Sequence, residues 1–159
     1  MKIIGIDPGL LNTGWGIIEV TPNRQLRYVA DGTIKPKATL PMPQRLFVIY
    51  EDLKKIIDEY HPTLAGLEDT FVSKFPQSTL KLGQAKGVAM LTPALFNIPV
   101  YEFSPTLIKK AITGVGGASK TQIDMMVKTL LNIKGKLESE HASDALAIAI
   151  ATSFYSKLH

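Results

Sequence analysis

Three acidic residues and one histidine are the side chains best placed to do chemistry. Asp7 ends the short apolar run that opens the chain, and Glu68 ends a second such run. Functional groups in open α/β sheets collect beyond the carboxyl ends of neighbouring strands, so we expect these two acids at one sheet edge. His141 and Asp144 are three residues apart near the start of a helical pattern, and their side chains therefore share a face. The pattern predicts one site containing all four.

The chemistry predicted for this site is that of a divalent metal. Carboxylates held close together repel one another strongly, and a cation removes that cost. Mg²⁺ and Mn²⁺ prefer oxygen ligands and keep bound waters, one of which can become a nucleophile. Two such ions about 3.5–4 Å apart would stabilise the attacking and leaving oxygens of a phosphodiester. The chain has no cysteine, which excludes thiolate metal sites and disulfides.

Each of these residues also has a simpler interpretation when it is taken singly. An acid after a strand is commonly a solvated turn residue, which applies to Asp7 and Glu68. An acid near a helix start, such as Asp144, favours the helix dipole or a cap. A lone histidine such as His141 is commonly a surface residue. Only their joint placement favours the metal site.

The elements that must position the site follow from hydrophobic periodicity and turn residues. Alternating or continuous apolar runs predict five strands, at 2–7, 13–20, 26–34, 64–68 and 100–103. Helical spacing predicts helices from about Pro43 to the residues before Pro62, at about 78–96 with a kink at Pro93, after the Ser104-Pro105 cap, at about 119–131 with a capping box, and at about 139–157. The fold class expected is α/β, a mixed five-stranded sheet flanked by helices, in one domain over 1–159.

Charge and hydropathy restrict the class of partner. Eighteen Lys and Arg against fourteen Asp and Glu give a formal net charge of +4, which fits a polyanionic partner without requiring one. No apolar stretch approaches the roughly 18 residues of a membrane span, and no signal peptide is recognisable at the start. We expect a cytoplasmic protein with no membrane contact.

Several motifs resemble the RuvC family of Holliday-junction resolvases, in order along essentially the whole chain. Gly-Ile-Asp-Pro-Gly at 5–9 and Thr-Gly-Trp-Gly at 13–16 resemble its opening strand and turn. Residues 68–71 and 80–89 are similar to its second acid and following helix, and residues 143–149 to its final catalytic helix. The resemblance implies an RNase H-like fold and a homodimer that makes paired, symmetric, metal-dependent cuts in four-way junction DNA during recombination and repair. It also implies the RuvA and RuvB branch-migration proteins as partners.

The resemblance further implies residues that contact DNA. Phe71, three residues beyond Glu68, would stack on a base unpaired at the junction, although a core position is the simpler interpretation of an aromatic residue. Lysines spread over the central helices and the glycine-rich loop would neutralise phosphates: Lys74, Lys81, Lys86, Lys109, Lys110 and Lys120. Lys109 and Lys120 match family positions near the scissile phosphate.

The last helix departs from the commonest family pattern. Asp-Ala-Ala-Asp-Ala is replaced here by His141-Ala142-Ser143-Asp144-Ala145. A neutral imidazole suits Mn²⁺ better than Mg²⁺, so we expect a stronger Mn²⁺ preference than in relatives with aspartate. His141 could be a ligand, a general base or a group that holds the attacking water, and the sequence does not choose among these roles.

Parts of the sequence also match four other functions. Asp7, Gly9 and Gly14 have the spacing of the phosphate hairpin in actin-like ATPases, but the chain is too short for the duplicated domain of that fold. Residues 114–121 miss a Walker A loop by one position, where Ser119 replaces glycine. An RNA-processing nuclease of the same fold and a junction-binding protein without catalysis both remain open.

Overall fold

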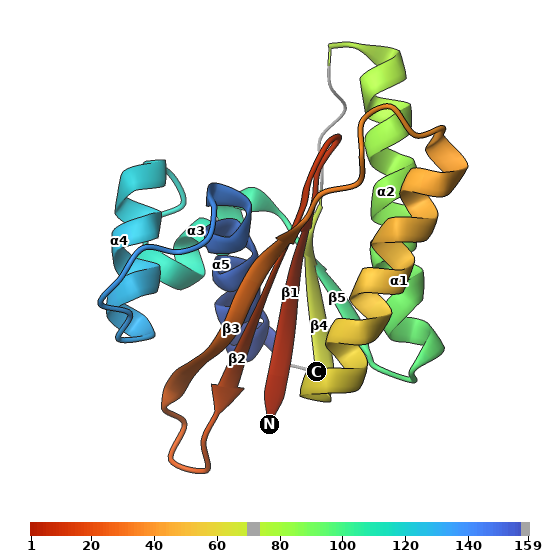
Figure 1. Cartoon of the computed structure of the whole chain (residues 1–159). Coiled ribbons are helices and arrows are strands. Elements are labelled where there is room, and N and C mark those ends of the chain that lie inside the picture. Colours follow the sequence, from red (N-terminus) through yellow and green to blue (C-terminus); the bar gives the residue numbers. More distant parts are fainter. Residues whose placement is uncertain (70–73, 157–159) are drawn as a thin grey trace.

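The computed structural model describes residues 1–69 and 74–156, and five of its strands form one sheet (Figure 1). They are β1 (Lys2–Pro8), β2 (Thr13–Val20), β3 (Leu26–Ile34), β4 (Leu64–Glu68) and β5 (Val100–Phe103). The order across the sheet is β3-β2-β1-β4-β5. The first three strands form an antiparallel meander, whereas β4 pairs parallel with β1 and β5 parallel with β4. The expected mixed five-stranded sheet is confirmed, with each strand within one residue of its predicted bounds.

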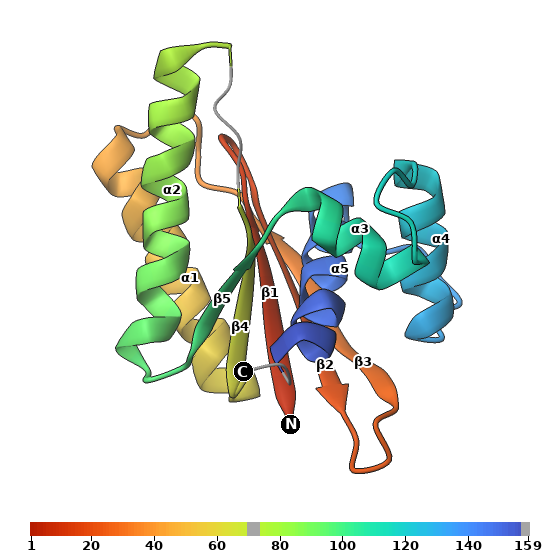
Figure 2. The ribbon, with the colours of Figure 1, turned by 180° about the vertical axis from the view of Figure 1, so that it is seen from behind.

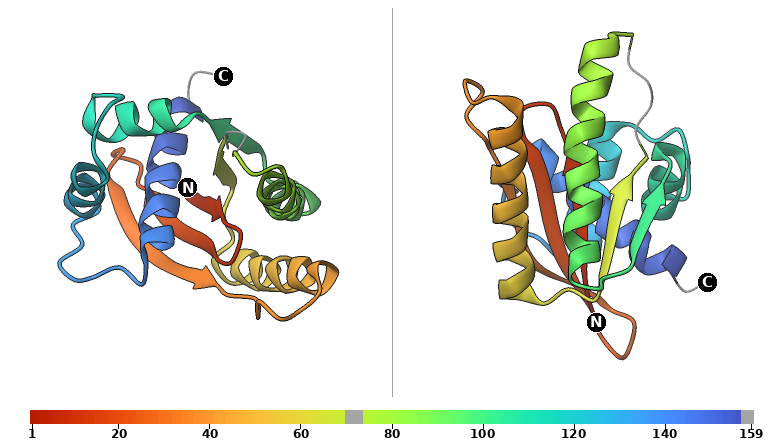
Figure 3. Two further views of the ribbon diagram at one scale, coloured as in Figure 1. Left: turned by 90° about the horizontal axis from the view of Figure 1, so that it is seen from above. Right: turned by 90° about the vertical axis from the view of Figure 1, so that its right-hand side faces the viewer.

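Helices cover both faces of the sheet. One layer consists of α1 (Met42–Tyr60) and α2 (Pro76–Leu95). The other consists of α3 (Pro105–Thr113), α4 (Lys120–Leu130) and α5 (Glu140–Tyr155) (Figures 2 and 3). Because β1 is central and both of its faces are covered, its Ile3, Ile4 and Ile6 are fully buried. Such β-branched runs are typical of strands buried on both sides.

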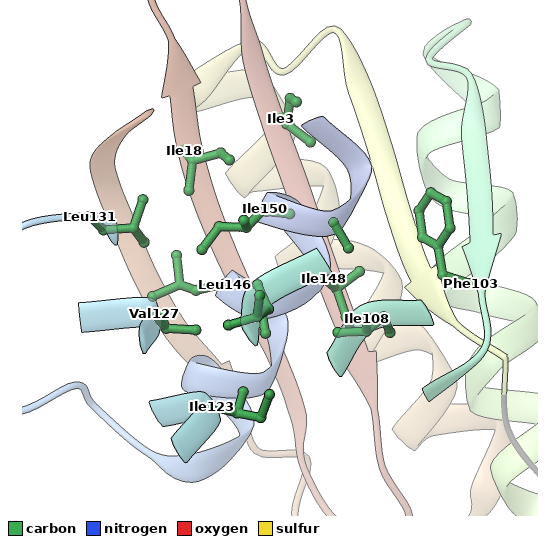
Figure 4. Close-up of a cluster of buried hydrophobic side chains, with 14 of the residues drawn as sticks. Ile3, Ile18, Phe103, Ile108, Ile123, Val127, Leu131, Leu146, Ile148 and Ile150 are labelled. Carbon is green, nitrogen blue, oxygen red and sulfur yellow. The ribbon is translucent and has the colours of Figure 1, made fainter. Parts of the chain in front are cut away.

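The helix α5 forms the centre of the second layer. It packs across β1, β2, β3 and β4, and its Leu146, Ile148 and Ile150 join a core cluster with side chains of α3 and α4 (Figure 4). Every residue from 142 to 153 is buried except Asp144. Asp144 is thus the one residue of this helical segment that is not buried, which makes it accessible to a ligand.

The helix starts follow the predicted capping residues. The Ser104 hydroxyl accepts a hydrogen bond from the Leu107 amide, and Ser119 and Gln122 form a complete capping box. The helix α2 begins at Pro76, two residues before the predicted start, because Phe75 is extended and proline is favourable at the first helical position. Pro93 lies inside the last turn of α2, where few hydrogen bonds remain to be lost.

The glycine-rich stretch before α4 differs from a phosphate-binding loop. It follows the helix α3, and Gly114 ends that helix with a left-handed backbone at φ 79°. A Walker A loop instead connects a strand to a helix. Within the described ranges, no helix is both long and apolar enough to cross a membrane.

Candidate active site

The two strand-end acids emerge at the same edge of the sheet. The parallel register pairs Ile6 of β1 with Leu67 of β4, so Asp7 and Glu68 each follow a paired residue. Both residues are partly buried, and the Asp7 side chain is 21% exposed. The sheet topology therefore brings together two residues that are far apart in the sequence.

Two glycines allow α5 to lie directly on the strands. A Cβ atom on Gly5 would collide with the carbonyl oxygen of Ala145, and one on Gly14 would collide with that of His141. The backbone of α5 thus approaches β1 and β2 more closely than any residue other than glycine at positions 5 and 14 would permit. This close approach places the first turn of α5 over the end of β1.

The first turn of α5 is also tied to the edge strand β3. The hydroxyls of Thr33 and Ser139 lie 2.6 Å apart, and the Glu138 amide donates to Asp31 at 3.2 Å. Ser139 caps the helix by accepting from the Ala142 amide. On the other side of the turn, His141 Nδ1 lies 3.2 Å from Asp7 Oδ2. The histidine of α5 and the aspartate of β1 are therefore in contact, as the sequence predicted.

Asp144 contacts the start of α4, which follows the glycine-rich stretch at 114–117. Its Oδ1 accepts a hydrogen bond from Lys120 Nζ at 2.5 Å. Both side chains line a cavity of about 280 Å³ that also contains Glu68 and Lys109. The two lysines that were predicted near the scissile phosphate therefore share a cavity with two of the predicted carboxylates.

Burial and mutual repulsion make these carboxylates costly to ionise. Burial, and then the charge of Asp144, raise the pKa of Asp7 from 3.8 to about 6. Burial, and then the charges of Asp7 and Asp144, raise the pKa of Glu68 from 4.5 to about 7. The pKa of Asp144 is also raised, chiefly by burial. Such shifts are characteristic of functional sites.

Lys120 is the positive charge that these acids have in common. Its ammonium group lowers the pKa of Asp7, Glu68 and Asp144, whereas Lys109 lowers that of Glu68. The three carboxylates are thus partly neutralised by one side chain. The remaining repulsion is what a divalent cation would relieve.

The three carboxylates and His141 are suitable ligands for such a cation, but their side chains do not surround a common point. In the described part of the chain, no three acidic or histidine side chains are close enough together to bind a metal as they stand. Asp7 is paired with His141 and Asp144 with Lys120. Three carboxylates and an imidazole are nevertheless the ligand types that suit Mg²⁺ and Mn²⁺.

The other predicted DNA contacts have different surroundings. Lys74, Lys81 and Lys110 are exposed. Lys86 is 13% exposed, and its Nζ lies 3.1 Å from Asp69 and 2.7 Å from Glu102. Its charge is therefore already neutralised within the protein. Phe71 lies outside the described residues.

Sequence reasoning missed the residues that support the site. Asp31 and Thr33 hold the start of α5, and Asp124 of α4 accepts a hydrogen bond from Ser143 at 2.6 Å. Asp124 is four residues after Lys120, on the same helical face. That spacing was the one available signal, and it does not identify Ser143 as the partner.

Comparisons with known proteins agree with this architecture. The family described as crossover junction endodeoxyribonuclease RuvC matches residues 3–152. Relatives of that name from Rhodopseudomonas palustris (strain TIE-1) and Bradyrhizobium diazoefficiens are 50% and 52% identical to this chain over 150 residues, which cover 94% of this chain and 85% of each relative. The structure of T. thermophilus RuvC in complex with Holliday junction substrate matches with a TM-score of 0.92 at 28% identity, covering 99% of this chain and 96% of that one.

The sheet order, the two helical layers and the acids at the ends of β1 and β4 define an RNase H-like protein. Within that class, the chain belongs to the crossover junction endodeoxyribonuclease RuvC family.

Proposed function

We propose that this chain resolves four-way (Holliday) DNA junctions by paired, symmetric, metal-dependent hydrolysis of phosphodiester bonds. The observation that carries the proposal is the convergence of Asp7, His141, Asp144 and Lys120 at one sheet edge beside Glu68. Family membership and the junction substrate bound by T. thermophilus RuvC support the substrate class.

In this proposal Asp7, Glu68, His141 and Asp144 hold Mg²⁺ or Mn²⁺, with two ions in each site. Such ions would supply a water nucleophile and stabilise charge on the reacting phosphate. Lys120 and Lys109, which line the cavity with Glu68 and Asp144, bind the scissile phosphate and orient it. His141 is a ligand whose ring is oriented by contact with Asp7.

The imidazole of His141 predicts a metal preference. Wild-type protein is expected to cleave a junction at least about tenfold faster in Mn²⁺ than in Mg²⁺, and the ratio should fall in His141→Asp, because imidazole suits transition metals better than Mg²⁺. Single-turnover rate constants in each metal measure the ratio. His61→Asp, a change at the exposed C-cap of α1, is the control. The idea fails if wild type cleaves as well in Mg²⁺ as His141→Asp does.

Five exposed or partly exposed lysines are proposed to form the DNA-binding surface. We assign phosphate contacts to Lys74, Lys81, Lys109, Lys110 and Lys120, and omit Lys86 because two carboxylates already neutralise it. Phe71 is proposed to stack on a base unpaired at the junction, a contact worth about 1–3 kcal/mol.

Phosphate contacts predict steep salt dependence. If five phosphates are neutralised, the logarithm of the association constant for junction DNA should fall with the logarithm of salt concentration. The expected slope is about −4 to −5 for one protomer. The slope should become shallower by about one unit in Lys81→Met and stay the same in Lys55→Met, because Lys55 is paired with Asp52 on α1. Junction titrations between about 50 and 200 mM salt, roughly a fourfold range, give these slopes. Binding that is insensitive to salt would contradict the surface.

Assembly follows from the symmetry of the substrate. A junction presents two strands of like polarity, so a twofold homodimer of residues 1–159, each protomer one nuclease domain, suits paired cuts. The RuvA and RuvB branch-migration proteins are the partners proposed to deliver the junction.

Cleavage of a synthetic mobile four-way junction tests the function. The wild-type protein is expected to nick two opposite strands at symmetric positions, leaving nicks that a ligase seals, and to leave a linear duplex of the same sequence uncut. Preferential cleavage of structured RNA would favour an RNA-processing nuclease. Tight junction binding without cleavage in either metal would indicate a non-catalytic junction-binding protein.

A further inference from the structure

The position of Lys120 at the active site depends on how its helix, α4, packs against the neighbouring helices. The helix α4 packs chiefly against α3 and α5. Its buried Ile123 and Val127 belong to the core cluster around α5 (Figure 4). Apolar contacts of this kind are strong but not directional. They hold α4 against α5, and directional polar contacts restrict its position further.

Two polar contacts between α4 and α5 are directional. Ser143 Oγ donates to Asp124 Oδ1 at 2.6 Å, and Lys120 Nζ donates to Asp144 Oδ1 at 2.5 Å. On α4 the two partners are four residues apart, one helical turn, whereas on α5 they are adjacent. Together the two contacts fix which turn of α4 lies opposite residues 143 and 144 of α5. We call this alignment the register of α4 on α5.

The contact through Asp124 is the more deeply set of the two. Ser143 is 4% exposed, while the Lys120 and Asp144 side chains are 44% and 36% exposed. A short hydrogen bond to a carboxylate that is partly shielded from water is stronger than one between neutral groups. When DNA binds, Lys120 is available to exchange Asp144 for a phosphate, but Asp124 keeps its partner.

We propose that Asp124 is a positioning residue for junction cleavage: its hydrogen bond to Ser143 sets the register of α4 on α5 and so holds Lys120 at the catalytic cavity. The inference rests on the proposed function for its consequence in cleavage. Ser143 lies inside α5, where alanine is a favourable helix former. Ser143→Ala therefore removes the hydroxyl while keeping a residue suited to a helix, so we expect this variant to fold.

Four variants test the register. Asp124→Ala, Ser143→Ala and the double variant each remove the bond, whereas Asp124→Asn keeps an acceptor oxygen for the Ser143 hydroxyl and removes the charge. Ser153→Ala is the matched control, because the buried Ser153 hydroxyl also makes a 2.6 Å hydrogen bond, to Ile150, further along the same helix.

We expect single-turnover cleavage about 10–30-fold slower in Asp124→Ala and in Ser143→Ala, with junction affinity changed by less than about threefold. The double variant should be no slower than either single one, because both changes remove the same contact. Asp124→Asn should retain at least a third of the wild-type rate, and Ser153→Ala should cleave like wild type. Amide hydrogen exchange along α4 should increase in the Ala variants and not in Ser153→Ala.

The outcomes separate this inference from the proposed function. Absence of junction cleavage by wild type would refute the function, while hydrogen exchange would still report the register. Unchanged cleavage in Ser143→Ala, rate losses that multiply in the double variant, or an Asp124→Asn variant as slow as Asp124→Ala would each overturn the positioning role.

Discussion

Asp7→Asn is expected to slow junction cleavage by at least about 10³-fold while junction affinity stays within about threefold of wild type. The carboxylate lies at the centre of the site, 3.2 Å from His141 and within the field of Asp144 and Glu68. An amide of the same shape keeps the packing but loses the charge proposed to bind a metal ion, and single groups of a metal site have effects of this size. Single-turnover rates in Mn²⁺ and junction titrations in Ca²⁺ measure the two quantities.

The same substitution should stabilise the metal-free protein at high pH. The pKa of Asp7 is about 6 in the folded state and near 3.8 when unfolded, so the folded state binds more protons between these values. The unfolding free energy of wild type therefore falls as pH rises from about 4 to about 6. Asparagine does not ionise and escapes this loss. Urea unfolding should show a gain of about 1–3 kcal/mol at pH 8 that disappears near pH 4.

Asp52→Asn provides the control for both measurements, because Asp52 is partly exposed and paired with Lys55 on α1. It should change neither the cleavage rate nor the pH dependence of stability. Cleavage by Asp7→Asn within tenfold of wild type would remove this residue from the site, whatever its effect on stability.

Lys120→Met should have the second largest effect, a loss of about 10²–10³-fold in cleavage rate. Its ammonium group lines the cavity with Glu68 and Asp144, where it would meet charge developing on the phosphate. It also lowers the pKa of all three carboxylates. Without it those pKa values rise, so the pH–rate profile should move to higher pH. Rates measured from pH 6 to pH 9 separate the shift from the loss at the plateau.

Metal affinity gives a second readout for Lys120. Removal of the ammonium frees Asp144 from its 2.5 Å contact, so Mn²⁺ should bind more tightly to Lys120→Met than to wild type in the absence of DNA. Lys109→Met is the matched comparison, because Lys109 lines the same cavity and lowers the pKa of Glu68 alone among the three acids. It should strengthen Mn²⁺ binding less. Equal rates for Lys120→Met and wild type would exclude a role at the phosphate.

Much of the fold could be predicted because its signals are local. Apolar runs bounded by turn residues located all five strands, and the caps at Ser104 and Ser119 located the starts of α3 and α4. The start of α2 was predicted two residues late, since Pro76 contributes no apolar periodicity. The convergence of Asp7 with His141 could be anticipated because strand ends and helix faces follow from period and direction.

The sequence by itself determined which segments are strands and helices, which acids follow the strand ends, and that glycine stands at positions 5 and 14. Only the tertiary structure decided that those glycines admit the backbone of α5, that Lys86 is neutralised by Asp69 and Glu102, and that Asp124 bonds to Ser143. The physical reason is the distance along the chain over which each kind of interaction acts. Propensity and periodicity act over a few neighbouring residues, whereas the partner of a charge or a hydroxyl depends on which distant segment packs against it.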